Sequence, residues 1–219
     1  MLEEAWAREA VRLHRRYQDE IVASCDLCPW AVRATQDGKI RERVSLQTDP
    51  TDMAPALSAI DEWQADPEAE VTFLIYPRLD VGRHAFHDFA ARLRDADGPR
   101  HPLGAIPFVL AAFHPDAEPD TADPERLIPF LRRSPDPTLQ LLRASVLDSI
   151  RSGAAQGTQF LDRASLEAMV SGTSQPPLRE RIARANLETA RRVGIDTLRA
   201  RLDDIRRDRE TTYRRLLQS

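Results

Sequence analysis

The chain has 219 residues, of which 42% are hydrophobic and 30% are charged, and its formal net charge is −4. This composition is typical of a soluble globular protein with one sizeable core, and the acidic balance argues against a generally basic nucleic-acid-binding surface. No segment approaches the roughly eighteen consecutive apolar residues of a membrane span, and the charged N-terminal segment lacks a signal-peptide core. We therefore expect a cytoplasmic protein that acts on a small-molecule substrate, with no nucleic acid and no membrane as partner.

The first part of the chain predicts two helices and a strand. Residues 2–24 carry apolar side chains at helical spacing, namely Trp6, Ala10, Leu13, Tyr17 and Ile21. Pro29 suits the first position of a second helix, which makes Cys28 its N-cap. The alternation of Val44 and Leu46 indicates a strand over residues 40–46.

The middle of the chain alternates helices with strands. Residues 52–65 and 83–95 have the apolar spacing of amphipathic helices, whereas residues 71–77 and 105–115 are apolar runs typical of buried strands. With the strand at 40–46, the order is β-α-β-α-β. Right-handed crossovers then predict an α+β fold, with a small, largely parallel sheet and flanking helices.

The remainder of the chain predicts a surface loop followed by helices. The acidic, proline-containing stretch 115–125 is typical of a loop. Asp136 and Pro137 suit the N-cap and first turn of a helix that continues to Ile150, and a further helix is expected around 158–170.

A charged helical tail is expected to follow the linker "SGTSQPP" at 171–177. We accordingly divide the chain into an α+β cofactor-binding domain, 1–175, and a C-terminal helical extension, 176–219. The tail carries apolar or small side chains at spacings of three, four or seven, namely Leu198, Leu202, Ile205, Thr212 and Leu216. This seam can pack on its own domain or form a homodimer through the C-terminal helix.

Both cysteines of the chain, Cys25 and Cys28, lie in the segment "CDLCPWA". A reducing location argues against a disulfide, and two cysteines alone cannot complete a zinc site. An N-cap position should lower the pKa of the Cys28 thiol and favour the thiolate, which attacks electrophiles and binds metal ions. The alternative is a pair of half-buried structural cysteines.

Two further segments are candidates for a site. His114 ends a predicted strand, where sites form in parallel sheets, although it can also cap the sheet edge through a hydrogen bond. Arg132, Arg133 and Ser134 precede the helix predicted from Asp136, so two guanidinium groups and a hydroxyl can form an anion site there. A solvated run of charges is the alternative.

The segments "CPWA", "FHP" and "RRSPDPTLQLLR", in this order, resemble the signature of an uncharacterised bacterial family of unknown function. That signature combines a CPFA-like motif, an FHP motif and an RSPxPTxHLLR-like motif. The resemblance covers roughly residues 20 to 150, and Gln140 stands where the signature has histidine. It implies no established activity.

The chain also has a distant resemblance to the small heme-dependent N-hydroxylases, the family of the arginine N-hydroxylases. Cys28-Pro29-Trp30-Ala31 is similar to their early CxxA motif, and Arg132-Arg133-Ser134 to a later Arg-Arg-Ser segment. The resemblance implies that Cys28 is the thiolate ligand of a heme b. Arginines would pair with the heme propionates, and Trp30, Phe108, Phe113 and Phe130 could line an apolar slot.

These observations lead to one main hypothesis and two rivals. The main hypothesis is a heme-thiolate oxygenase that acts on a small nitrogenous molecule. Cys28 and His114 would be its metal and catalytic residues, with Trp30, Arg132, Arg133 and Ser134 also at the cofactor. One rival is a cofactor-free cysteine-dependent enzyme with Cys28 as nucleophile and His114 as base. The other is a non-enzymatic interaction module that uses the C-terminal helix.

Overall fold

The computed structural model describes residues 1–102, 105–151 and 177–218. Their central element is a four-stranded sheet in the order β1-β2-β4-β3, formed by β1 (Ile40–Val44), β2 (Val71–Ile75), β4 (Thr138–Arg143) and β3 (Phe108–Phe113). Strand β1 is parallel to β2, whereas β4 is antiparallel to both β2 and β3. The α+β class is confirmed. The expectation of a largely parallel sheet is wrong, because two of the three strand pairings are antiparallel.

The wrong prediction comes from the segment after Asp136, which was expected to form a helix over residues 137–150. Its first half is strand β4, and a helix, α6 (Ala144–Arg151), begins only after it. Leu139 and Leu141 pack on one face of the sheet and Leu142 on the other. An apolar run buried on both sides has no clear period of two, so spacing alone does not separate it from a helix.

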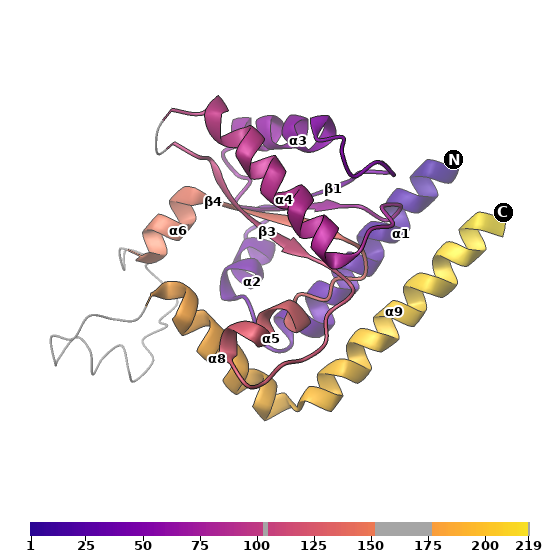
Figure 1. Cartoon of the computed structure of the whole chain (residues 1–219), viewed down its shortest axis with the longest axis vertical. Helices are drawn as coiled ribbons and strands as arrows, with labels where there is room; N and C mark the ends of the chain where they lie inside the picture. Colours follow the sequence, from indigo (N-terminus) through magenta and orange to yellow (C-terminus); the bar gives the residue numbers. More distant parts are fainter. Residues whose placement is uncertain (103–104, 152–176, 219) are drawn as a thin grey trace, which may run out of the picture.

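The two sheet faces are covered by different helices (Figure 1). Helices α3 (Ala54–Ala65) and α4 (Arg83–Asp97) cover one face, called here the α4 face, where Leu74, Tyr76 and Leu139 are buried. Helices α1 (Leu2–Tyr17) and α2 (Pro29–Gln36) cover the opposite face, called here the α2 face, where Phe73 is buried with Ala10 and Ala34. Adjacent residues on a strand therefore pack against different helices.

Several predicted helices and strands are confirmed in place. The helix predicted over 2–24 is α1 continued by the π-helical turn η1 (Gln18–Ala23), and Cys28 is the N-cap of α2 with Pro29 at its first position. A 3-10 turn, η2 (Gly98–Arg100), follows α4. The loop predicted over 115–125 ends where α5 (Pro124–Leu131) begins, with the Glu125 amide donating to the Asp123 carboxylate at 2.7 Å.

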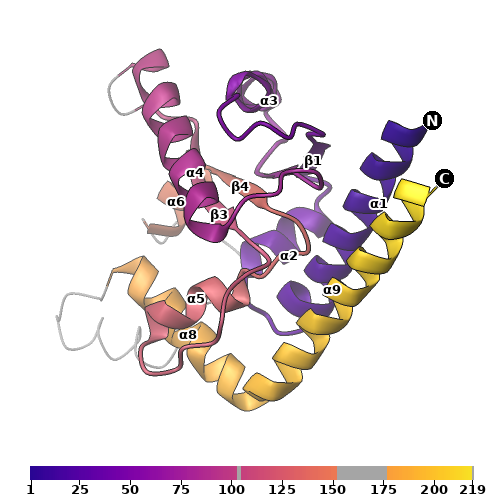
Figure 2. The same cartoon turned by 45° about the vertical axis from the view of Figure 1, so that its right-hand side comes forward.

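The C-terminal part forms two helices, α8 (Leu178–Val193) and α9 (Ile195–Gln218), which turn at Gly194. Gly194 has φ +93°, a conformation that suits glycine. Helix α9 runs beside α1, so that the two chain ends lie close together (Figures 1 and 2). The helix expected at 158–170 and all but Pro177 of the linker at 171–177 lie outside the described residues. No described helix is long and apolar enough to cross a membrane.

The seam of α9 is occupied within the chain. Leu198, Leu202 and Ile205 are buried in one cluster with Tyr17 of α1 and Phe130 of α5. The Trp6 and Tyr213 rings stack with their centroids 4.4 Å apart. The seam residues proposed for a homodimer thus already cover the chain's own core, and a homodimer through α9 remains a hypothesis that needs other residues.

Candidate functional site

Cys28 lies at the start of α2 beside the α2 face of the sheet. Its side chain is half-buried and packs against the cluster that contains Tyr17, Phe113 and Phe130. Burial raises the pKa of the Cys28 thiol to about 11, although the amide N–H groups of α2 and the charge of Arg132 act in the opposite direction. The expectation of a lowered thiol pKa is therefore wrong, because desolvation outweighs the helix N-terminus.

Cys25 has a different environment from Cys28. It is 2% exposed in the core, and its sulfur lies 3.5 Å from the hydroxyl of Ser24. Both cysteines are free thiols. The half-buried Cys28 is therefore the one that a small molecule can reach.

Arg132 is a charged residue close enough to Cys28 to act on the pKa of its thiol. It is the C-cap of α5, and its guanidinium lies over the Phe113 ring, 5.3 Å from the ring centroid. Burial lowers the pKa of Arg132, while the nearby Tyr17 and Cys28 act to raise it. No hydrogen bond or ion pair joins its guanidinium to another residue in the described part of the chain. A half-buried cation without an anionic partner is costly, so Arg132 is suited to receive an anion.

The sheet adds a third polar group on the same face. Strand register places Gln140 between Phe73 on β2 and Ala111 on β3. Phe73 belongs to the cluster against which Trp30 packs, and Ala111 packs on the cluster that includes Cys28. Gln140 therefore lies on the α2 face of the sheet. Its half-buried side-chain amide has no hydrogen bond with any described residue.

This part of the α2 face is open to solvent beside Gln140. Val109, on the neighbouring edge strand β3, is 48% exposed, and Ala111 is half-buried. Cys28 and Arg132 are close enough to influence each other's pKa, and strand register places Gln140 on the same face of the sheet. We call these three polar residues the Cys28 site.

His114 lies on the other side of the sheet. Its neighbour Phe113 packs on the α2 face against Tyr17, whereas the His114 ring lies 6.0 Å from Phe86 of α4. Both ring nitrogens are engaged: Nε2 donates to the Val81 carbonyl at 2.9 Å and Nδ1 accepts from the Asp116 amide at 3.1 Å. The structure therefore does not bring Cys28 and His114 together, and His114 caps the sheet end by hydrogen bonds.

Arg133 and Ser134 are held by protein groups. The Arg133 guanidinium donates to the Pro115 carbonyl at 3.0 Å and to the Asp203 carboxylate of α9 at 2.9 Å. The Ser134 hydroxyl donates to the Asp136 carbonyl at 2.5 Å. These residues precede strand β4 and not a helix N-terminus, so the anion site expected in front of a helix is not formed there.

Burial and register identify Gln140 more clearly than the sequence did. The sequence marked it as the position that departs from the family signature but assigned it no role. Its position could be found only after β4 was recognised as a strand, because the helix predicted there gives no register against Phe73 or Ala111.

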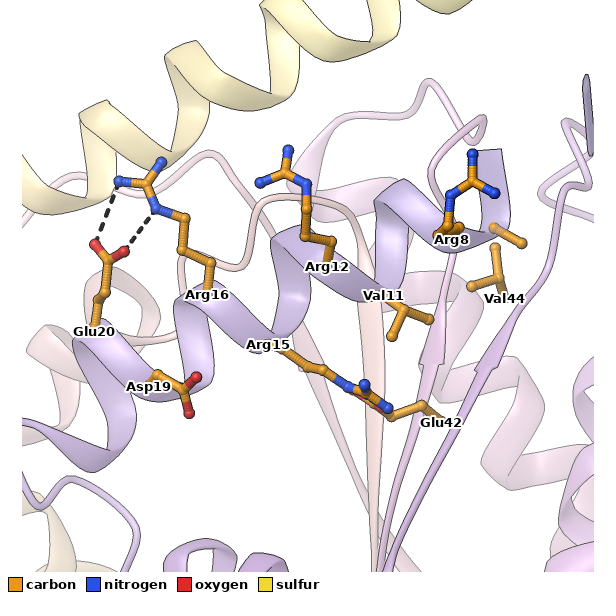
Figure 3. A pocket seen from close by; sticks show the side chains of 10 residues that line it. Arg8, Val11, Arg12, Arg15, Arg16, Asp19, Glu20, Glu42 and Val44 are labelled. Carbon is orange, nitrogen blue, oxygen red and sulfur yellow. Dashed lines mark hydrogen bonds and ion pairs between the residues drawn. The ribbon is translucent and has the colours of Figure 1, made fainter. Parts of the chain in front are cut away.

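The row of arginines along α1 is a weaker candidate (Figure 3). Arg8, Arg12, Arg15 and Arg16 line a shallow pocket beside β1. Arg15 pairs with Glu42 at 2.6 Å, and Arg12 and Arg16 pair with Asp208 of α9 at 2.9 and 3.0 Å. Most of this positive charge is therefore neutralised within the chain.

The fold and the Cys28 site define an α+β protein with a mixed sheet and a thiol beside a cation. The family model described as "Protein of unknown function (DUF1415)" matches residues 9–156, so the chain belongs to this family. No curated protein and no solved structure gives a significant match. The family's function is unknown, and the comparisons offer no support for the resemblance to heme-dependent N-hydroxylases.

Proposed function

We propose that the chain binds a small anionic molecule at the Cys28 site and acts on it through the Cys28 thiol. The observation that carries this proposal is the half-buried guanidinium of Arg132, which has no anionic partner in the described part of the chain and lies close enough to influence the Cys28 thiol. Arginine presents a planar fork that fits a carboxylate or phosphate. The Gln140 amide offers a further donor and acceptor to the same ligand.

Of the functions considered, the geometry best supports a cofactor-free enzyme with Cys28 as nucleophile. The residue that assists Cys28 differs from the one first expected. Arg132 replaces His114 as the group that assists Cys28, since His114 lies on the opposite face. With a thiol pKa of about 11, only roughly one molecule in ten thousand carries the thiolate at pH 7. Cys28 is therefore a slow nucleophile that depends on a bound and correctly positioned electrophile.

A heme between the residues first considered does not fit this arrangement. His114 and Phe108 lie on the α4 face, Cys28 and Phe113 lie on the α2 face, and the Arg133 guanidinium is occupied by Asp203. No single heme plane can reach both sets of residues through the sheet. A heme-thiolate oxygenase of small nitrogenous molecules remains an untested hypothesis. Of the residues first considered, those on the side of Cys28 are Trp30, Phe113, Phe130 and Arg132.

Alkylation of Cys28 by a charged and a neutral reagent tests the proposed anion site. Both chains carry Cys25→Ser, so that Cys28 is the cysteine that reacts. We measure the rate of alkylation by iodoacetate divided by the rate of alkylation by iodoacetamide. This ratio should fall by roughly tenfold when Arg132→Gln is added, because the loss of about 1.4 kcal/mol of charge attraction corresponds to a factor of ten. Peptide mass spectrometry confirms that Cys28 is the residue modified. Arg78→Gln is the matched control, since Arg78 lies over the Trp6 ring away from Cys28.

The same experiment can contradict the proposal. An equal rate ratio in Arg132→Gln and its parent would mean that the guanidinium does not attract an anion to the thiol. Titration with hemin is the separate test of the rival. A Soret band that shifts in the parent chain but not in Cys28→Ser would favour heme ligation over the cofactor-free site.

A further inference from the structure

A second cavity lies beyond the carboxyl end of β3, between α4 and the pair α5 and α9. It is open to solvent and is lined by the first turn of α4, the acidic loop after β3, α5 and α9. Its lining is rich in charged side chains: Arg83, His84, Pro115, Asp116, Ala117, Glu118, Asp120, Arg126, Pro129, Arg133 and Arg206. None of these residues belongs to the Cys28 site.

Hydrogen bonds between separate elements of the fold hold the walls of this cavity in place. His114 joins the Val81 carbonyl, just before α4, to the Asp116 amide in the loop. Arg133 joins the Pro115 carbonyl to Asp203 of α9. The two segments singled out in the sequence, "FHP" and "RRSP", therefore meet here and hold three elements around one opening.

The cavity contains four arginines and three carboxylates, and one of these arginines lacks a partner among the described residues. Arg83 has no hydrogen bond or ion pair in the part of the chain that the structure describes. Arg126 contacts the Asp120 carboxylate at 3.4 Å, whereas Arg206 contacts Asp116 at 3.5 Å and Glu210 at 3.3 Å. The Glu118 side chain is 89% exposed, and among the described residues it pairs with Arg199, at 3.7 Å.

We propose that this cavity binds a small free oxyanion, a phosphate or a carboxylate, through the guanidinium of Arg83. Arg126 and Arg206 are placed to turn from their distant carboxylates toward the bound anion. The rigid backbone around His114 keeps the opening formed in the absence of the ligand, which reduces the ordering cost of binding. No residue of the Cys28 site lines this cavity, although α5 contributes to both places.

Thermal unfolding of the full chain with inorganic phosphate and with malonate, at constant ionic strength, tests the proposal. A ligand that binds only the folded state raises the melting temperature in a concentration-dependent way, which gives its dissociation constant. We expect Arg83→Gln to weaken this constant by roughly tenfold or more, since a charge-assisted contact is lost. Circular dichroism confirms that the variant is folded.

Arg132→Gln and Arg78→Gln are the matched controls. A site at Arg83 predicts that Arg78→Gln keeps the full response to the anion, and that Arg132→Gln keeps the part of the response that Arg83→Gln removes. A response lost in Arg132→Gln and kept in Arg83→Gln would assign the anion to the Cys28 site instead and overturn this inference. The absence of any response to both anions in the parent chain would also overturn it.

Discussion

Two neighbouring arginines show how local packing decides what a residue can do. Arg132 and Arg133 follow one another in the sequence and were equivalent candidates there. In the fold, the Arg133 guanidinium donates hydrogen bonds to the Pro115 carbonyl and to Asp203. Arg132 instead lies beside Cys28 and over the Phe113 ring, without an anionic partner among the described residues. The ability to bind an anion at this site therefore depends on which arginine lacks an anionic partner in the protein, and not on the number of arginines.

A buried histidine gives the first prediction, which concerns stability against pH. His14 is 0% exposed, its Nδ1 has no partner, and burial lowers its pKa to about 3. Between pH 6.5 and 3 the unfolded chain binds a proton at this position and the folded chain does not, so acid favours unfolding. We expect His14 to cost about 2 kcal/mol of stability when the pH falls from 7 to 5.

Urea unfolding at pH 7 and pH 5 measures this loss. His14→Leu should remove most of the pH dependence assigned to this residue, because leucine keeps the volume and does not titrate. His84→Gln is the control substitution at an exposed histidine. A parent and a His14→Leu variant with the same pH dependence would contradict the burial argument.

At the scale of elements, the entry to β4 connects the sheet to α9. Asp136, expected as a helix N-cap, is 0% exposed and accepts a hydrogen bond from Arg209 Nε at 2.6 Å and another from the Tyr213 hydroxyl at 2.6 Å. Burial raises the pKa of Asp136, while both partners act to lower it. Arg209, which interrupts the apolar seam of the tail, is thus the cation that this buried carboxylate requires.

Removal of that cation gives the second prediction. Arg209→Met should destabilise the chain by about 3 kcal/mol, because it leaves a buried carboxylate without its charge partner. The double variant Asp136→Asn, Arg209→Met should recover much of the loss, since the unpaired charge is gone. Chemical unfolding of the three chains measures this, with Arg214→Gln on the exposed side of α9 as control. Additive losses in the double variant would show that the two residues are not coupled.

The sequence identified the elements that have a clear period or a clear boundary. The N-terminal helix, the N-cap at Cys28 and the strand at 71–77 could be predicted because apolar spacing and proline position mark them directly. Strand β4 could not be predicted, since "TLQLLR" is apolar on both faces and follows an Asp-Pro pair that also suits a helix start. That single error changed the sheet from mixed to parallel and hid the role of Gln140.

The thiol pKa shows a second limit of the sequence. The N-cap position of Cys28 was correctly predicted, but the sign of the pKa shift depends on burial by α5 and the C-terminal helices. Those helices are far away in sequence, so no local pattern reports how much water reaches the sulfur. The same reason explains why His114 was a candidate base until its partners at Val81 and Asp116 were visible.

At the scale of the whole molecule, the C-terminal helices complete the core. They lie beyond the residues 9–156 that the family model matches. Leu187 and Ala190 of α8 and Leu202 of α9 are nevertheless buried with residues of α1 and α5. Ion pairs of 2.5 to 3.0 Å join Arg12 and Arg16 of α1 to aspartates of α9. The division between 1–175 and 176–219 remains a prediction, but the two parts share one cluster.

Truncation of the chain gives the third prediction. A chain that ends at Ser174 loses α8 and α9, and so exposes Tyr17, Leu127 and Phe130, which are each 0% exposed in the full chain. Fully burying one large apolar side chain contributes about 1.5–3 kcal/mol, so exposure of several is comparable with the whole stability of a domain. The buried Asp136 carboxylate would lose both Arg209 and Tyr213 at the same time.

We therefore expect the truncated chain to lack a cooperative thermal transition, and to bind the dye ANS, whereas the full chain melts in one step. Addition of a separate 176–219 peptide should restore the transition if the two parts meet through the contacts seen in the fold. A truncated chain that melts cooperatively near the temperature of the full chain would show instead that residues 1–175 form an independent domain. In that case α9 would pack on a domain that folds without it, and another protein could take the place of α9 on that surface.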